Sequence, residues 1–418
     1  MFRKLVSLDE AQRILKDHFS PKPIGVEQIP ISQACNRVLA RDVVASVDVP
    51  PFDRATVDGY AVRAEDTFGA EENRPITLEF SGDIPVGMLP SITVEHGTAA
   101  GIVTGAPLPK GADAVVMIEY TARKGSTIVL RHPVSKGENI MKAGSDIKKG
   151  EAILGKSEVL SSRTVGALAA VGLTKIEAHR RPTVAILSTG AEIIDPGERL
   201  PPGKIYDINT HTLSAAVVEC GGDPVNFGVV SDETDHLKTM IQRALNSADV
   251  VLTSGGVSVG PKDIVPKVLA ALGAPGVVVH GVAMKPGKPT TIAVINGKPV
   301  FSLPGHPTSA LLAFQIFARP MISRMGGRAK EPFAVLEALA ATRMFPAKGR
   351  RTFIMVKLVK DASGSLLASP VPLGLSGAIT TLTKAEGFVK IREERQFVDV
   401  GDEVTVYLFN PKRRVSQS

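Results

Sequence analysis

Tryptophan is absent from this chain, and aromatic residues of all kinds make up only 5% of its 418 residues. Proteins that bind single-stranded nucleic acid interleave basic and aromatic side chains on which the bases stack, and no such pattern occurs here. The 49 basic residues only slightly outnumber the 42 acidic ones, and they cluster only at 412–414. We therefore expect no nucleic-acid partner, and the net charge of +7 suits an acidic small ligand.

Cysteine is nearly absent as well. Cys35 and Cys220 stand far apart, in no spacing typical of a metal or redox site, so a disulfide framework is not expected. No apolar run approaches the ~18 residues that a membrane-spanning helix needs, and the N-terminus lacks the core of a signal peptide. We expect a soluble protein of the reducing cytoplasm that does not bind a membrane.

The chain is too long for one ordinary hydrophobic core, so two to four domains are expected. In residues 181–328, strand-like runs such as TVAILST alternate with helical runs, which predicts a doubly wound, mainly parallel sheet. Residues 46–146 have the texture of short strands and turns, and residues 329–418 that of a small closing domain resembling a β-barrel. The predicted fold class is α/β plus β-rich domains, opened by a helix at 8–18.

Each predicted strand of the 181–328 region ends in a loop, and the carboxyl ends of parallel strands share one edge where ligands bind. The loop TSGGVSVGPKD, residues 253–263, combines glycines that permit close backbone approach with hydroxyl groups. A helix beginning near Asp263 would point its free N–H groups at an anion. The alternative is a plain strand–helix turn with Asp263 as its N-cap. The residues concerned are Ser254, Gly255, Gly256, Ser258 and Gly260.

Two lysines follow in the next loop of this edge. Lys285 and Lys288 lie in MKPGKPT, a stiff Pro-Gly-Pro frame that suits phosphate-binding point charges better than solvated surface lysines. The loop LPGHP, residues 303–307, is comparably stiff. It carries His306, which could contact a ligand or a metal, although a lone loop histidine more often does neither.

Three carboxylates, Glu192, Asp232 and Asp263, belong to the same edge. Hard cations such as Mg²⁺ take oxygen ligands and share them with substrate phosphates, so acidic residues beside phosphate-binding lysines predict a metal–phosphate centre. Caps and turns could explain each carboxylate separately. In the 46–146 region, Asp58 before Gly59 could be a hairpin turn and Thr104 part of a loop, so neither would be assigned a function from its own chemistry.

Taken together, these segments resemble the MoeA family of molybdopterin molybdenumtransferases, which includes the E domain of gephyrin. The resemblance runs in order over nearly the whole chain. The matching stretches are PPFDRATVDGYAVR (50–63), TGAPLPKGADAVVMIE (104–119), AGSDI (143–147), AILSTGAEI (185–193), GKIYDIN (203–209), TSGGVSVGPKD (253–263), MKPGKP (284–289), LPGHPTSA (303–310) and LSGAITTLTKAEGF (375–388).

The resemblance implies four domains: 1–45 together with 147–180, then 46–146, 181–328 and 329–418. It also implies a homodimer whose site joins the α/β domain of one subunit to the 46–146 domain of the other. The implied enzyme, a molybdopterin molybdotransferase, uses adenylated molybdopterin, molybdate and a divalent cation such as Mg²⁺. The adenylate is hydrolysed and the metal enters the dithiolene, giving molybdenum cofactor and AMP.

The resemblance also assigns roles to residues. Glu192, Asp232 and Asp263 would hold the cation, and Lys285 and Lys288 would neutralise phosphoryl charge. The pterin-phosphate and its loop would be contacted by Ser254, Gly255, Gly256, Ser258, Pro304, His306 and Pro307. The partner subunit's Asp58, Thr104 and Asp146 would complete the site.

Three positions depart from the family pattern. His306 stands where Asn is common, Met141 where some members have Arg, and Gly281 where some have a further Lys. Oxyanion binding could therefore be tuned differently, and tungstate could replace molybdate.

Two other functions remain open. One is the adenylyltransferase of the preceding step, whose single-domain relatives share the glycine loop, and which could also be a partner of this enzyme. The other is a non-catalytic scaffold of the same fold, which could lose the charged residues without penalty.

Overall fold

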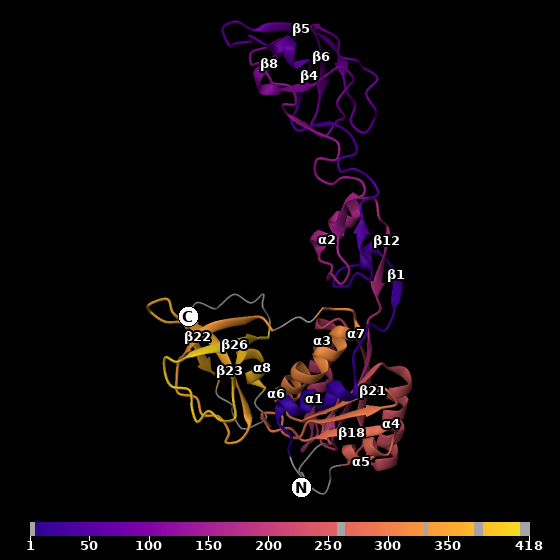
Figure 1. The fold of residues 1–418 in the computed structure, drawn as a ribbon, viewed down its shortest axis with the longest axis vertical. Helices are drawn as coiled ribbons and strands as arrows, with labels where there is room; N and C mark the ends of the chain where they lie inside the picture. The colour runs from indigo at the N-terminus through magenta and orange to yellow at the C-terminus, as the bar shows by residue number, and fades with distance from the viewer. Residues whose placement is uncertain (1–4, 257–263, 330–332, 372–378, 410–418) are drawn as a thin grey trace. The chain divides into compact units, whose positions relative to one another are not determined.

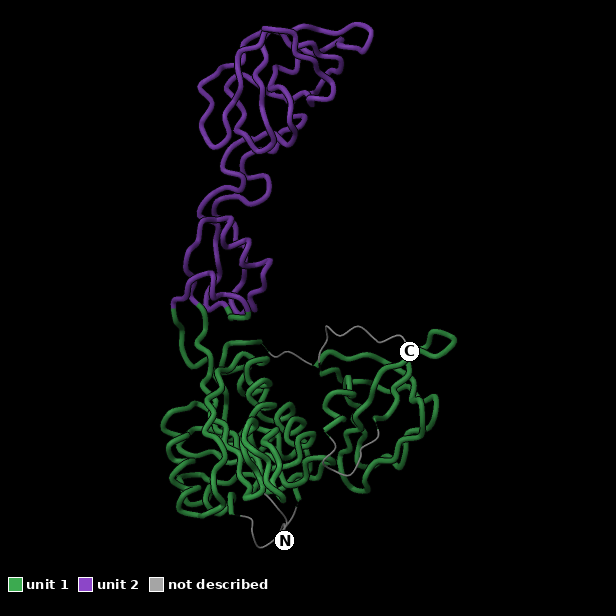
Figure 2. The backbone as a smooth tube through the Cα atoms, turned by 180° about the vertical axis from the view of Figure 1, so that it is seen from behind, with its two compact units in different colours: residues 1–27, 36–38, 178–418 green, residues 28–35, 39–177 purple. Residues whose placement is uncertain are grey.

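The computed structural model describes residues 5–256, 264–329, 333–371 and 379–409. The chain divides into two compact units, shown in Figure 2. Unit 1 comprises residues 1–27, 36–38 and 178–418, and unit 2 comprises residues 28–35 and 39–177. The boundaries of the four expected domains remain a prediction.

The centre of unit 1 is a six-stranded sheet (Figure 1). Its order is β16 (Asp223–Val230), β13 (Thr183–Thr189), β17 (Val250–Ser254), β21 (Lys298–Leu303), β20 (Thr291–Ile295) and β18 (Pro275–His280). The first four strands run parallel, and β20 runs antiparallel to both of its neighbours. The mainly parallel sheet is confirmed.

Alternate residues of β13 pack on opposite faces of this sheet, as its period of two requires. Val184 and Ile186 join one apolar cluster with helices α1 (Leu8–His18), α3 (Asn209–Glu219), α6 (Pro307–Ala313) and α7 (Arg319–Met325). Ala185 and Leu187 join another with α4 (Thr234–Ser247) and α5 (Val265–Ala270). Helices therefore cover both faces, and the doubly wound prediction is confirmed. So is the predicted opening helix, because α1 spans the expected residues and is capped by the Ser7 hydroxyl.

Strand β20 was not among the expected strands. It forms a hairpin with β21 through Asn296 and Gly297, whose φ values of 51° and 81° fit a two-residue turn. The Asn-Gly pair was the sequence signal for this turn.

The C-terminal part of unit 1 is a second sheet, with the order β19 (Met284–Lys285), β23 (Arg351–Lys360), β24 (Leu366–Pro370), β22 (Val335–Ala340), β26 (Glu403–Leu408) and β25 (Gly387–Ile391). A further pairing between β23 and β25 closes the last five strands into a barrel. The helix α8 (Thr380–Lys384) follows the barrel strand β24. The barrel-like prediction is confirmed.

Unit 2 is rich in strands, as predicted. Its largest sheet has the order β7 (Ala114–Met117), β4 (Gly59–Val62), β6 (Thr98–Ile102), β5 (Ile76–Asp83), β9 (Thr127–Leu130) and β8 (Thr121–Lys124). Shorter pairs join β3 (Arg54–Ala55) to β10 (Ile140–Met141) and β2 (Val43–Val44) to β11 (Ala152–Leu154). The helix α2 (Ser162–Ala170) begins at a capping box of Ser161 and Thr164.

The remaining short elements connect these sheets and helices. They are β1 (Val26–Pro30), which pairs with β12 (Lys175–His179), β14 (Ile193–Ile194), which pairs with β15 (Ile205–Tyr206), the 3-10 turns Ile31–Gln33, Ala64–Thr67 and Ile118–Tyr120, and the π-helical turn Phe314–Ala318.

Within the described residues, no helix combines the length and the apolarity that crossing a membrane requires. Both cysteines have free thiols, in agreement with the expectation of no disulfide framework.

Candidate functional site

The strand registers bring the predicted loops to one edge of the central sheet. Thr189 pairs with Val230, and Ser254 pairs with both Ser188 and Leu303, so β13, β16, β17 and β21 end side by side. The loops that carry Glu192, Asp232, the glycines and the prolines therefore leave from the same edge.

The lysine loop belongs to this edge as well, but at its far end. Residues 281–290 join the end of β18 to the start of β20, where Thr291 pairs with both His280 and Ser302. Five interstrand spacings separate β16, which precedes Asp232, from β18, which precedes Lys285, and they amount to about 24 Å. A ligand that reaches both ends of the edge must be extended.

The glycines of the loop after β17 are required by packing. Gly255 and Gly256 have φ values of 91° and 64°. A Cβ atom on Gly255 would lie 2.1 Å from the backbone oxygen of Thr189, and one on Gly256 would lie 2.7 Å from the Thr189 hydroxyl. Backbone conformation and packing therefore explain why glycine occupies both positions. Their contact with a ligand remains a prediction. Ser258, Gly260 and Asp263 lie outside the described residues.

Ser254 is turned inward. Its side chain is buried, its hydroxyl accepts a hydrogen bond from Asn209 Nδ2 at 2.7 Å, and it donates one to the Pro304 carbonyl at 3.3 Å. The hydroxyl holds the two loops together, and its predicted contact with a ligand stays a prediction. Asn209 Nδ2 also donates to the Gly305 carbonyl at 2.7 Å.

A buried aspartate supports this contact. Asp207 Oδ1 accepts hydrogen bonds from the Ser188 hydroxyl at 3.0 Å and from the Thr210 backbone N–H at 3.1 Å. Neither Asp207 nor Asn209 was singled out from the sequence, although both lie in the stretch GKIYDIN. The sequence signal was the position of Asp207, three residues before Thr210. This spacing is typical of an aspartate that caps the first turn of a helix.

The two described carboxylates of the predicted cation site are exposed. The carboxylate of Glu192 lies over Gly190, where its Oε1 is 2.9 Å from the position that a Cβ would occupy. Asp232 follows β16 directly. The part of the chain that the structure describes contains one group of three metal-capable side chains, Glu65, Asp66 and His96, and it lies in unit 2.

That group has ordinary partners within the protein. Asp66 Oδ2 accepts a hydrogen bond from the Gly97 N–H at 2.9 Å, and Asp66 Oδ1 contacts His96. Glu65 pairs with Arg63. These contacts explain the group without a metal ion.

The lysine loop is built into the junction between the central sheet and the barrel. Lys285 is exposed, and its backbone pairs with Thr352 of the barrel strand β23. Lys288 is half-buried, and its carbonyl accepts from the Val282 N–H at 3.0 Å. Gly281 has a φ of 85°, so a lysine at this position would be strained.

The proline loop leads into α6. Pro304 is buried and Pro307 is half-buried, and His306 is exposed at the start of the helix.

In unit 2, Asp58 and Thr104 contact each other directly. Asp58 Oδ1 accepts hydrogen bonds from the Thr104 backbone N–H at 2.7 Å and from its hydroxyl at 2.8 Å. These two bonds lower the pKa of the exposed Asp58 carboxyl below its ordinary value. The family resemblance assigns both residues to one site but does not predict this contact.

Two further contacts in unit 2 join residues 53–54 to residues 141–143. Asp53 accepts hydrogen bonds from the Lys142 amine at 2.8 Å and from the Ala143 N–H at 2.9 Å, which lower the pKa of its carboxyl. The guanidinium of Arg54 lies 3.3 Å from the sulfur of Met141, the residue that stands where some family members have Arg. An arginine side chain is therefore still present beside this position. Asp146 is exposed on the adjoining turn.

Comparison with known proteins covers most of the chain. Residues 6–172 match the MoeA N-terminal region (domain I and II), residues 185–324 a probable molybdopterin binding domain, and residues 337–409 the MoeA C-terminal region (domain IV). A molybdopterin molybdenumtransferase 2 of Mycobacterium tuberculosis is 34% identical over 96% of this chain and 99% of its own. A molybdopterin molybdenumtransferase of Bacillus subtilis is 34% identical over 97% and 94%.

Solved structures are similar to this chain over the same length. Two MoeA protein structures from Pyrococcus horikoshii are 43% and 33% identical to this chain, with TM-scores of 0.81 and 0.77. Each alignment covers 97% of this chain and all of the other. The chain belongs to the MoeA family.

Proposed function

We propose that this protein is a molybdopterin molybdotransferase that inserts molybdate into adenylated molybdopterin and releases AMP. The observation that carries the proposal is the shared edge of the central sheet, where the glycine, lysine and proline loops leave together. An extended ligand with a phosphate at one end suits this edge. The names of the relatives that match nearly end to end support the same reaction.

The lysine loop would bind the phosphoryl group. Lys285 is exposed and has no partner among the described residues, so its charge is available to a ligand. Together with Lys288 it would neutralise the negative charge that grows as the adenylate bond breaks. The backbone N–H of Gly256 and the hydroxyl of Ser258 would bind the pterin-phosphate, and Gly255, whose N–H donates to the Leu303 carbonyl, would permit its close approach. Pro304, His306 and Pro307 would shape its far side.

The residues present suit a divalent cation such as Mg²⁺. Glu192 and Asp232 are exposed carboxylates without a partner among the described residues, and hard cations take oxygen ligands of this kind. With Asp263 they would hold the cation, which when bound supplies positive charge beside the phosphate.

A second copy of the chain would complete the site. In this homodimer, Asp58 of the partner subunit, fixed by the partner's Thr104, would approach the ligand with an ionised carboxylate. Asp146 of the partner subunit would lie in the same group. We place the enzyme in the cytoplasm, where an adenylyltransferase would supply the adenylated pterin.

The test compares two substrate pairs with purified protein. Adenylated molybdopterin with molybdate should yield AMP and molybdenum cofactor, whereas molybdopterin with ATP should not yield adenylated pterin. Consumption of ATP with accumulation of adenylated pterin would instead assign the preceding step. Tungstate tested in parallel with molybdate identifies the working metal.

A variant separates catalysis from scaffolding. Asp263→Ala should abolish cofactor formation and leave the oligomeric state unchanged. Full activity in this variant would contradict the cation site, and an inactive wild-type chain would favour the scaffold.

A further inference from the structure

Asn209 joins two loops of the candidate site through one side chain. It is the first residue of α3 and is only 6% exposed. Its amide nitrogen donates to the Ser254 hydroxyl and to the Gly305 carbonyl, both at 2.7 Å. Because a carbonyl oxygen can only accept, the nitrogen must face Gly305, and both of its protons are used.

Among the described residues, the other contacts between these loops are longer. Beyond the paired residues Ser254 and Leu303, the Gly255 N–H reaches the Leu303 carbonyl and the Ser254 hydroxyl reaches the Pro304 carbonyl, each at 3.3 Å. Within the described part of the two loops, Asn209 therefore makes the shortest hydrogen bonds that hold the glycine loop against the proline loop.

A buried network anchors the first turn of α3, which carries Asn209. Asp207 is 3% exposed, and its Oδ1 ties the first turn of α3 to Ser188 at the end of β13. Asp207 Oδ2 and Asn209 Oδ1 are buried and have no partner among the described residues. A buried polar atom without a hydrogen-bond partner destabilises the folded state. Stability alone therefore does not explain why these two side chains are buried here.

We propose that Asn209 is a positioning residue of this edge, which sets the spacing between the glycine loop after β17 and the proline loop before α6. Asp207 anchors the helix turn that carries the asparagine. The inference rests on the proposed function for its catalytic consequence. A shift of about 1 Å in such loops is enough to slow a reaction about 100-fold.

The test uses Asn209→Ala in the full-length chain, with Asn226→Ala as a matched control. Asn226 is exposed on β16, and its side chain accepts a hydrogen bond from the nearby Gly228 N–H, with no other side-chain partner among the described residues. Amide hydrogen exchange is measured across the chain, and kcat and KM are measured with adenylated molybdopterin and molybdate.

For Asn209→Ala we expect exchange at least about tenfold faster at Gly255, whose N–H is protected by its hydrogen bond to the Leu303 carbonyl, with unchanged rates in the barrel and in unit 2. We expect kcat to fall about 10- to 100-fold while KM stays within about threefold. The control should match the wild type.

Two exchange results would contradict the positioning role of Asn209. Unchanged loop exchange, or acceleration spread evenly over unit 1, would overturn the inference, because Asn209 would then be dispensable or merely structural. If the wild type does not turn over the adenylated pterin, the proposed function fails, and the exchange measurement still tests the positioning role.

Ser254→Ala covers the case in which Asn209→Ala does not fold. It removes one acceptor of the asparagine and leaves the bond to Gly305, so it should give the same local acceleration to a smaller extent. Wild-type exchange in this variant would also overturn the inference.

Discussion

Asp58 shows how a single exposed residue acquires a defined chemical state. Both of its hydrogen bonds come from Thr104, one from the backbone and one from the hydroxyl, and both favour the ionised carboxylate. The group therefore keeps its negative charge at lower pH than an isolated aspartate, whose pKa is 3.8. A carboxylate with a fixed orientation and a constant charge suits a role in contacting a ligand.

The hydroxyl contribution to this pKa can be measured. Thr104→Val removes the hydroxyl and keeps the shape and the backbone N–H, so the pKa of Asp58 should rise toward 3.8. Thr104→Ser keeps the hydroxyl and should leave the pKa low. Carboxyl carbon chemical shifts, followed by NMR during acid titration, report both values, and equal values in the two variants would contradict the assignment.

The sign of the related pH effect on stability follows from the lowered pKa. A carboxyl whose pKa is lower in the folded state contributes stability above its unfolded pKa, and this contribution is lost as the pH falls through the folded value. Removing the Thr104 hydroxyl should therefore reduce the acid dependence of unit 2 unfolding.

Gly256 shows a steric requirement at the same scale. A Cβ atom there would lie 2.6 Å from Val265 Cγ2, and the residue has a positive φ. Gly256→Ala should lower the free energy of unfolding of unit 1 by about 2–4 kcal/mol, from backbone strain and overpacking together. Gly305→Ala is the matched control at the same edge, since its Cβ would meet its nearest atom at 3.7 Å, and it should cost less than about 0.5 kcal/mol. Urea unfolding measures both, and equal stabilities would refute the packing explanation.

Single residues were predicted unevenly from the sequence. Glu192, Asp232, Lys285 and the glycines could be proposed from the sequence because they follow strands whose carboxyl ends share an edge. Asn209 was missed because its role depends on two partners, Ser254 and Gly305, that are 45 and 96 positions away in the chain. No local pattern contains such a contact.

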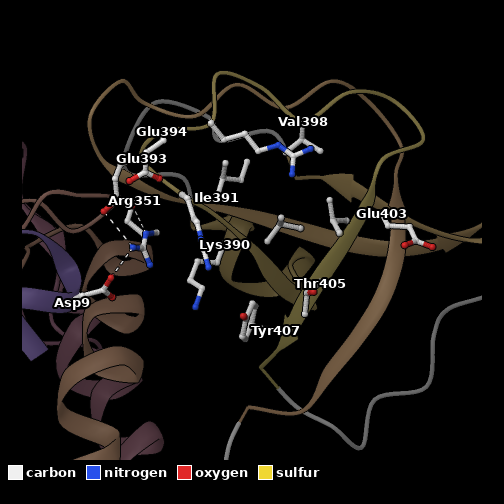
Figure 3. Close-up of a pocket in the computed structure, with 14 residues that line it drawn as sticks. Asp9, Arg351, Lys390, Ile391, Glu393, Glu394, Val398, Glu403, Thr405 and Tyr407 are labelled. Atoms are coloured by element: carbon white, nitrogen blue, oxygen red, sulfur yellow. Dashed lines mark hydrogen bonds and ion pairs between the residues drawn. The ribbon is translucent and has the colours of Figure 1, made fainter.

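At the scale of elements, α1 is attached to the barrel by an arginine. Arg351, at the start of β23, is buried and contacts both Glu393 of the barrel and Asp9 in the first turn of α1. Figure 3 shows these contacts at one end of a pocket lined by charged and polar residues of the barrel. The hydrogen bond from Arg351 lowers the pKa of Glu393.

The two carboxylates should contribute unequally to stability. The Glu393 side chain is 23% exposed and that of Asp9 is 72% exposed. Glu393→Gln should therefore destabilise unit 1 by about 1–2 kcal/mol, whereas Asp9→Asn should cost less than about 0.5 kcal/mol. Urea unfolding at neutral pH provides the comparison, and the reverse order would contradict this account of the junction.

The Glu393 contribution should depend on pH. Its pKa is lowered from 4.5 in the folded state, so the stabilisation is present above that value and is lost as the pH falls. The difference between wild type and Glu393→Gln should consequently shrink in acid.

Several elements of the central sheet could be predicted from hydrophobic periodicity, because β13, β17 and β21 are almost wholly buried and rich in apolar residues. Strand β20 escaped, although all five of its residues are buried. Its residues directly follow the Pro-Gly-Pro frame of the lysine loop, and a segment beside two prolines and a glycine is typical of a loop and not of a strand.

At the scale of the whole molecule, the residues of the proposed site are divided between the two units. Lys285 belongs to unit 1, and Asp58 and Thr104 belong to unit 2. Sequence patterns indicated the residues of unit 1, whereas only the family resemblance pointed to Asp58 and Thr104. Patterns of this kind could not predict whether two copies of the chain combine the two groups, because symmetry of assembly leaves no local pattern in a sequence. The family resemblance alone suggested a dimer.

The most direct test of the account is complementation between two inactive variants. Asp58→Ala and Lys285→Ala chains are purified separately, mixed under conditions that exchange subunits, and assayed for AMP release from adenylated molybdopterin with molybdate. In a mixed dimer one site combines both mutations and the other has neither, so activity should recover to about one quarter of the wild-type value. A mixture that contains mixed dimers by native mass spectrometry and yet stays as inactive as either variant alone would contradict the shared site.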